Sequence, residues 1–156
     1  MNESEQFNES DFDPKNYSKL HGLFTKDTWN AEFVEEMKPV EMQDGEKEIV
    51  LTGRSNFNAF EGTNLEQILR ENRITQLCIA GFITNLCVEE TARSAHDTFG
   101  NLMDVVVVTD GCAARSLKEH NNCTIITLPL FCNTMSCSDY VADLSGESNE
   151  CCCTVS

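Results

Sequence analysis

The chain has 156 residues, enough for one domain whose core can fold alone. Eleven Lys and Arg residues stand against 26 Asp and Glu residues, which gives a net charge of −15. A surface this acidic repels phosphate backbones, so we exclude nucleic acid as a partner. No apolar run approaches the roughly 18 residues that a membrane-spanning helix requires.

The nine cysteines are odd in number, and three of them are consecutive near the C-terminus. The N-terminal residues lack the basic start and apolar stretch of a secretory signal, so we expect reduced thiols and a cytoplasmic location. No CxxC pair occurs, and His21, His96 and His120 lie far from any cysteine pair at ligand spacing. The sequence therefore predicts no metal and no cofactor.

Residues 1–24 have little apolar content and no period, which predicts a flexible acidic arm. Apolar side chains recur near helical spacing over residues 29–37, and Pro39 ends that stretch. The short apolar run at residues 48–52 (EIVLT), bounded by Gly53, predicts a buried strand.

Residues 63–66 (TNLE) have the form of a capping box and predict a helix that begins there. Residues 75–80 (TQLCIA) predict a second strand, in which Cys78 behaves as a small buried hydrophobe. A further helix is expected from about Asn85 to Phe99, because apolar residues trace one stripe along it. These residues are Val88, Thr91, Ala92, Ala95 and Phe99.

The four valines at residues 105–108 predict a parallel strand buried on both faces. Residues 124–144 predict a helix end or short strand followed by a last helix, and residues 147–156 a Cys-rich flexible tail. Strands that alternate with helices imply right-handed βαβ units. We therefore expect an α/β domain over residues 25–146, a three-layer α-β-α arrangement with a parallel sheet.

The most informative segment is residues 81–88 (GFITNLCV), which follows a predicted strand and opens a helix. Ligands bind at this carboxyl end of a parallel sheet. Thr84 or Asn85 is expected to cap the helix and place Cys87 in its first turn. There the free amides and the helix dipole favour a thiolate and a developing oxyanion. On spacing alone, a nucleophile and an ordinary buried thiol both remain open.

Three blocks resemble the isochorismatase-like cysteine hydrolases, a group that includes nicotinamidases, carbamoylsarcosine amidases and ureidoacrylate amidohydrolases. The blocks are residues 54–65 (RSNFNAFEGTNL), residues 80–92 (AGFITNLCVEETA), and residues 108–114 (VTDGCAA) with His120 following. The second block is the most specific. The resemblance covers roughly residues 25–144 and implies the Rossmann-like fold of that family.

The resemblance implies that Cys87 attacks a carbonyl or imidoyl carbon and forms an acyl-enzyme that water releases. It also implies a cis peptide bond between Phe82 and Ile83, which helps aim the amides of Ile83 and Cys87 into an oxyanion hole. The substrate pocket would be lined by Phe57, Phe60 and Thr84, with core packing as the alternative for the two phenylalanines.

Family members use a triad of Asp, Lys and Cys. Arg54 stands at the Lys position, where a permanently charged guanidinium stabilises a thiolate or an oxyanion but is a poor proton shuttle. The family Asp ends an apolar first strand, and no such run precedes residue 25, so we expect an N-terminally truncated fold without its first strand. Two hypotheses follow: a hydrolase of a small amide or related bond, and a catalytically inactive pseudoenzyme or interaction module that keeps the partial fold.

The expected partners are a small-molecule substrate and, because exposed sheet edges favour self-association, further copies of the chain. Residues 153–156 (CTVS) fit the C-a-a-X pattern, so a membrane becomes a partner only if Cys153 is lipidated. Asp110 ends a predicted strand and either faces the site or serves as a cap or turn residue.

Overall fold

The computed structural model describes residues 28–39, 48–54 and 56–146. The chain divides into two compact units, residues 1–50 and residues 51–156. The predicted acidic arm at residues 1–24 and the tail at residues 147–156, with its lipidation motif, lie outside the described residues.

The first unit contains two short 3₁₀ turns, Trp29–Ala31 and Glu35–Met37. The helical spacing over residues 29–37 therefore does not produce a continuous helix, and that interpretation is wrong. Trp29 is 84% exposed, and the other apolar side chains of the stretch are exposed as well. Helices this short gain most of their stability from a packed face, which these described residues do not have.

The strand predicted at residues 48–52 is also wrong, because the described residues 48–54 form no strand. A strand requires a hydrogen-bonding neighbour, and no described segment pairs with this one. Ile49 and Val50 are exposed. The apolar composition of the run was therefore not sufficient to make it part of the sheet.

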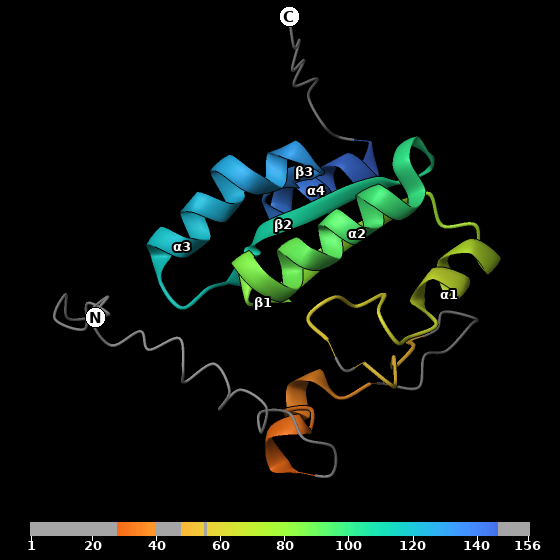
Figure 1. Cartoon of the computed structure of the whole chain (residues 1–156). Coiled ribbons are helices and arrows are strands. Elements are labelled where there is room, and N and C mark those ends of the chain that lie inside the picture. The colour runs from red at the N-terminus through yellow and green to blue at the C-terminus, as the bar shows by residue number, and fades with distance from the viewer. Residues whose placement is uncertain (1–27, 40–47, 55, 147–156) are drawn as a thin grey trace, which may run out of the picture. The chain divides into compact units, whose positions relative to one another are not determined.

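The second unit is built on a parallel three-stranded sheet in the order β1-β2-β3 (Figure 1). Its strands are β1 (Gln76–Phe82), β2 (Asp104–Ala113) and β3 (Asn133–Met135). The two strands predicted at residues 75–80 and 105–108 are thus confirmed. Each is longer than its apolar run.

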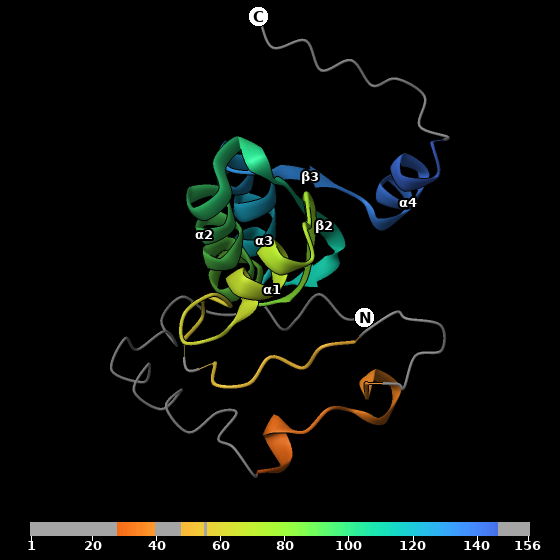
Figure 2. The same cartoon turned by 90° about the vertical axis from the view of Figure 1, so that its right-hand side faces the viewer.

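Helices lie on both faces of this sheet. In Figure 2, α2 (Glu89–Phe99) and α3 (Leu117–Asn122) lie on one side of the strands and α4 (Cys137–Ser145) on the other. Alternate valines of β2 serve the two faces: Val105 and Val107 join the core cluster beneath α2, and Val106 and Val108 point to the opposite face. The three-layer α/β fold predicted from the sequence is confirmed.

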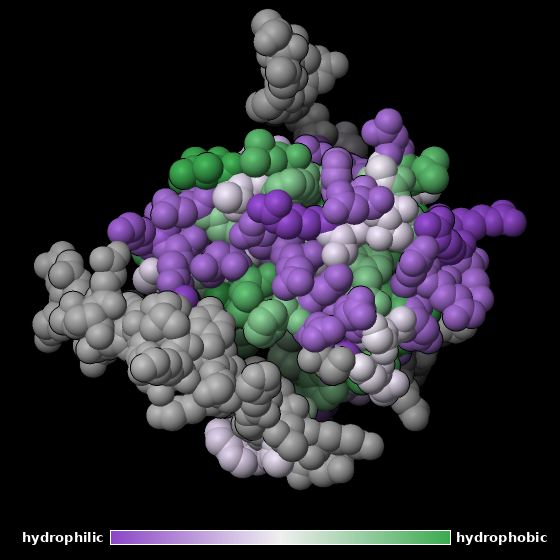
Figure 3. Space-filling model, viewed as in Figure 1, coloured by the Kyte–Doolittle hydropathy of each residue, from purple (hydrophilic) through white to green (hydrophobic). Residues whose placement is uncertain are grey.

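The apolar stripe predicted for residues 85–99 is buried along its whole length. Ala92 and Ala95 are fully buried, and their small side chains let α2 lie close to the sheet. The outer face of α2 carries charged residues, and hydrophilic side chains cover much of this side of the molecule (Figure 3). The helix is therefore amphipathic, as its spacing indicates.

Helix α1 (Leu65–Glu71) forms where the capping box predicts it, with Leu69 buried against the core. The box itself is not made. Asn64 is the N-cap, its side chain makes no capping hydrogen bond to any described residue, and Glu66 instead pairs with Arg70. The side chain of Thr63 accepts a bond from the amide of Leu65.

The outer face of β1 is open to solvent. Gln76, Cys78, Ala80 and Phe82 alternate with partly buried residues, and all four are exposed. The prediction that Cys78 is buried is therefore wrong, because the side-chain period of a strand places it on the face away from α2.

The C-terminal elements follow the predicted order of a helix end and a last helix. A wide π-helical turn, η7 (Cys123–Thr127), and a tight 3₁₀ turn, η8 (Leu128–Leu130), extend α3 before β3 begins. The Asp110 carboxylate accepts a hydrogen bond of 2.7 Å from the amide of Cys137, which opens α4. The N-cap of α4 is Ser136, so the Asp110 carboxylate adds a tertiary bond to the first turn of this helix. No helix among the described residues is long and apolar enough to cross a bilayer.

Candidate active site

Cys87 lies in the turn that joins β1 to α2. The strand ends at Phe82, the Phe82–Ile83 peptide bond is cis, and the wide turn η5 (Thr84–Val88) runs directly into α2. The Ile83 carbonyl accepts hydrogen bonds from the amides of Leu86 (3.1 Å) and Val88 (3.2 Å). Cys87 thus occupies the opening turn of the helical run, and its side chain is half-buried.

The predicted side-chain cap of this helix is wrong. The N-cap is Ile83, and no described side chain supplies a capping hydrogen bond. The Oγ1 atom of Thr84 lies 3.0 Å from Nδ1 of His120 on α3, and Oδ1 of Asn85 is buried without a partner among the described residues. The Thr84 side chain therefore makes a tertiary contact instead of a local cap, and sequence spacing cannot reveal such a contact.

The first sequence block docks onto the helix that follows Cys87. The amide of Ala59 donates to Oγ1 of Thr91 (3.1 Å), and Nδ2 of Asn58 donates to Oγ of Ser94 (2.7 Å). Thr91 is four residues after Cys87, so the two share one side of the helical run. The structure thus brings two blocks that are distant in sequence to the same side of the helix.

The other predicted site residues of the first block differ in their surroundings. Phe60 packs against the core with its ring 6.1 Å from that of Phe99, whereas the Phe57 side chain is exposed. The guanidinium of Arg54 donates to the backbone carbonyls of Asn56 and Phe57. Arg54 therefore stabilises its own loop in this structure.

A groove of about 270 Å³ lies beside the same turn. Asn85 and Glu89, four residues apart, line it together with side chains of α3 and η7. Cys87 is not among the residues that line this groove. Within the groove wall, the Cys123 thiol lies 3.3 Å from the Glu89 carboxylate, which also pairs with Arg93.

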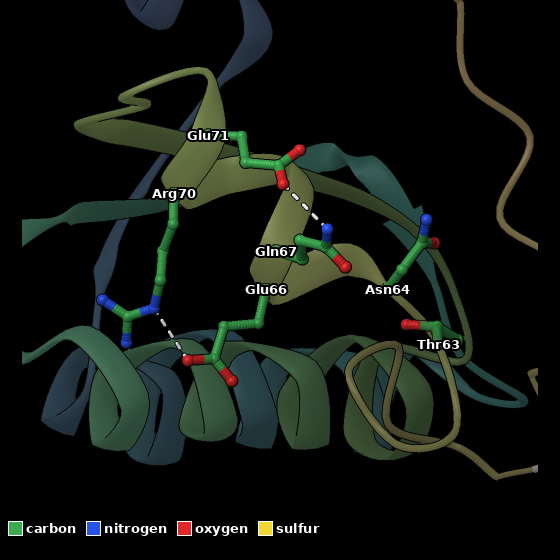
Figure 4. Close-up of a pocket in the computed structure, with 6 residues that line it drawn as sticks. All are labelled: Thr63, Asn64, Glu66, Gln67, Arg70 and Glu71. Atoms are coloured by element: carbon green, nitrogen blue, oxygen red, sulfur yellow. Dashed lines mark hydrogen bonds and ion pairs between the residues drawn. The ribbon is translucent and has the colours of Figure 1, made fainter.

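A larger groove of about 510 Å³ runs along α1 and shares no residue with the turn of Cys87. Its polar side chains pair with one another along the helix, Glu66 with Arg70 and Gln67 with Glu71 (Figure 4). Such i,i+4 pairs are typical of a solvated helix face. We therefore assign the candidate active site to the Cys87 turn and not to this groove.

Partial or full desolvation raises the pKa of four thiols above the usual value. The pKa of Cys123 rises to about 11 and that of Cys132 to about 12, and Cys78 and Cys112 shift in the same direction. These four thiols carry little thiolate at neutral pH. Among the described residues, no group of three His, Cys, Asp or Glu side chains is arranged to hold a metal ion.

The sequence did not predict the contact between His120 and Thr84 or the docking of Asn58 on α2. The spacing between these partners is 36 residues in both cases, so no local pattern links them. The available signal was weaker: His120 follows the third block of the resemblance, and Asn58 lies inside the first.

The Isochorismatase domain family matches residues 5–137, which is most of the chain. The chain belongs to this family. The match begins within the segment that the sequence analysis treats as an acidic arm, and it includes all three blocks.

Two curated relatives illustrate the similarity. An isochorismatase family protein of Bacillus subtilis, YrdC, is 33% identical over 67% of this chain and 51% of its own length. The ureidoacrylate amidohydrolase RutB of Agrobacterium fabrum is 32% identical over 53% of this chain and 34% of its own length. This chain therefore spans about a third to a half of these relatives.

Solved structures agree with the fold. An isochorismatase-like hydrolase from Alkaliphilus metalliredigens aligns with a TM-score of 0.69 and 25% identity over 83% of this chain and 65% of that protein. An isochorismatase family protein from Desulfovibrio vulgaris aligns with a TM-score of 0.66 and 27% identity, covering 84% of this chain and 64% of its own.

Proposed function

We propose that this chain is a cysteine hydrolase that acts on a small amide or related bond through Cys87. The observation that carries the proposal is the position of Cys87, half-buried in the opening turn of a helix at the carboxyl end of a parallel strand. The positive end of a helix stabilises negative charge that develops beside its first turn. The similarity to an amidohydrolase supports an amide-type bond as the target.

The proposed reaction proceeds in two steps. The Cys87 thiolate adds to the carbonyl carbon, the C–N bond breaks, and the amine leaves with the proton that the thiol gave up. Water then adds to the thioester, the C–S bond breaks, and a proton returns to sulfur. In both steps the amides of Ile83 and Cys87 are the proposed donors to the oxyanion.

Arg54 has a more limited role in this proposal. Its guanidinium stays charged, so it stabilises the thiolate or the oxyanion and leaves proton transfer to solvent. The loop from Arg54 to Phe60 reaches the Cys87 side of the helix through the bond between Ala59 and Thr91. Phe57, which is exposed, is the proposed aromatic contact for a substrate.

The second candidate function is a catalytically inactive member that serves as an interaction module. The observation that favours it is the engagement of the Arg54 guanidinium with the carbonyls of Asn56 and Phe57. If that engagement persists, Arg54 closes its loop and does not assist Cys87.

The deciding experiment measures ammonia release from a panel of small primary amides and ureido acids. We expect turnover by the parent chain, loss of turnover in Cys87→Ser, and rates within about twofold of the parent in Cys137→Ser. Cys137 is a matched control because its thiol is exposed and lies at the start of α4, outside the turn. Turnover that persists in Cys87→Ser, or no turnover of any compound, would overturn the proposal.

A second pair of variants tests Arg54. Replacing it by Lys restores the residue type of the resembling family, and replacing it by Ala removes the charge. The hydrolase proposal predicts that Arg54→Lys keeps or raises turnover while Arg54→Ala lowers it at least tenfold. Equal rates in all three chains would show that Arg54 only closes its loop.

A further inference from the structure

Side chains of α3 and η7 contact the first residue of the turn that carries Cys87. Thr84, its first residue, is 0% exposed, and its Oγ1 lies 3.0 Å from Nδ1 of His120. The carbonyl of the same residue accepts a longer contact of 3.5 Å from the Cys123 thiol. His120 and Cys123 are three residues apart and therefore share one helical face, so both contacts come from the same side.

This support matters because the local stabilisation of the turn comes from backbone bonds to the Ile83 carbonyl and not from a cap by a described side chain. No described side chain caps it, and Asn85 has non-helical backbone angles (φ −85°, ψ 22°). The Thr84 side chain is fully buried, and a buried hydroxyl needs a hydrogen-bond partner, which the imidazole of His120 supplies. The orientation of the first residues of η5 therefore depends on a side chain 36 residues away.

We propose that His120 is a positioning residue for the nucleophile, acting through Thr84. The inference rests on the proposed function of Cys87. His120 meets the turn at the Thr84 hydroxyl, three residues before Cys87, so in this proposal it acts through Thr84 and not on the thiol itself. Its role is to fix Thr84, which in turn fixes the direction of the Cys87 side chain and of the neighbouring amides.

The geometry identifies which nitrogen does this. Nδ1 faces Thr84, and either the hydroxyl donates to an unprotonated Nδ1 or a protonated Nδ1 donates to the hydroxyl oxygen. An Asn side chain places a polar atom near the position of Nδ1, whereas a Gln side chain reaches toward Nε2. His120→Asn is therefore the conservative variant, which keeps the contact with Thr84, and His120→Gln is the matched control that should lose it.

Amide hydrogen exchange of the intact chain, read by mass spectrometry on peptides, tests the positioning directly. We expect exchange over residues 83–88 to speed up at least tenfold in His120→Ala and His120→Gln and to return close to the parent rate in His120→Asn. Exchange over residues 105–108 in β2 is the internal reference and should stay within twofold. Equal acceleration in both segments, or no change at residues 83–88, would overturn the inference.

Kinetics test the consequence for catalysis. We expect kcat to fall at least tenfold in His120→Ala with KM within threefold of the parent, and His120→Asn to recover most of it. Thr84→Val removes the hydroxyl with little change of shape, so His120→Ala should add nothing to its effect. His96→Ala, an exposed position on α2, is the control for an unrelated histidine and should match the parent.

The two proposals fail in different ways. If the parent chain has no turnover, the hydrolase proposal fails, and exchange at residues 83–88 still reports whether His120 holds the turn. If exchange accelerates while kcat stays at the parent value, the catalytic role of His120 is refuted and the hydrolase proposal remains.

Discussion

Replacing Leu128 by Ala is expected to remove a large part of the stability of the second unit. Leu128 is 0% exposed and belongs to the core cluster with Val107, Ala92 and Ala95. Truncation of a fully buried Leu to Ala costs about 2–5 kcal/mol, because the lost burial adds to the cost of the cavity. Small domains are stable by only about 5–15 kcal/mol, so this single change is a substantial fraction.

The same short turn contains its own control. Leu130 is two residues further along η8 and is 70% exposed, so Leu130→Ala should change the free energy of unfolding by less than about 0.5 kcal/mol. The two variants delete the same atoms from the same element. Their difference therefore measures burial and not the loss of a Leu side chain as such.

Urea unfolding followed by circular dichroism is a suitable assay, since a changed midpoint at constant slope reports stability. In a thermal scan followed by the same signal, a loss of about 2 kcal/mol should lower the midpoint temperature by about 8 °C for a domain of this size. A cost below about 1 kcal/mol for Leu128→Ala, or equal costs for the two variants, would refute the position of η8 against the sheet. That position also sets where α3 and η7 meet the Cys87 turn.

Three further predictions concern single side chains. Desolvation raises the pKa of Cys123 from 9.0 to about 11 in the folded chain. The stability that comes from keeping this thiol protonated, at most about 3 kcal/mol, is therefore present below pH 9 and lost as the pH rises toward 11. Cys123→Ala should flatten the fall in midpoint temperature between pH 9 and 11, and an unchanged slope contradicts this. Gly53→Ala should destabilise more than Gly146→Ala. Both glycines have positive φ, but only a Cβ at Gly53 meets the Gly62 carbonyl, at 2.9 Å; equal unfolding midpoints argue against that close approach. Ser116→Ala should cost about 1 kcal/mol in urea unfolding through loss of the α3 cap, and a neutral result would remove the cap from the account.

Several elements could be predicted because a periodic signal coincided with a packed partner. Both predictions were confirmed because the stripe along α2 packs on Val105 and Val107, while the other two valines of β2 are buried on the opposite face of the sheet. Residues 48–52 carried a similar apolar signal but find no pairing segment among the described residues, and the strand does not form. The apolar side chains over residues 29–37 are exposed for the same reason. A periodic apolar pattern predicts a helix or strand only where the fold provides another element against which its apolar face packs.

The candidate site shows the same division. The cis bond between Phe82 and Ile83 and the place of Cys87 in the opening turn agree with expectations drawn from one contiguous block of sequence. The cap on that turn was wrongly assigned to Thr84 or Asn85, because local spacing was the only information used. The side chain of Thr84 instead contacts His120, which lies on another helix.

The sequence by itself determined the parallel α/β architecture and the family, and it predicted Cys87 as the nucleophile, because each of these inferences depends on patterns within a few consecutive turns. Only the tertiary structure decided that Thr84 is buried against His120, that Cys78 is exposed, and that Arg54 bonds to its own loop. The physical reason is that these outcomes depend on where the folded chain places each side chain. Thr84 and His120 are 36 positions apart, the face that Cys78 takes is set by where α2 packs on the sheet, and the bonds of Arg54 depend on the conformation of its loop.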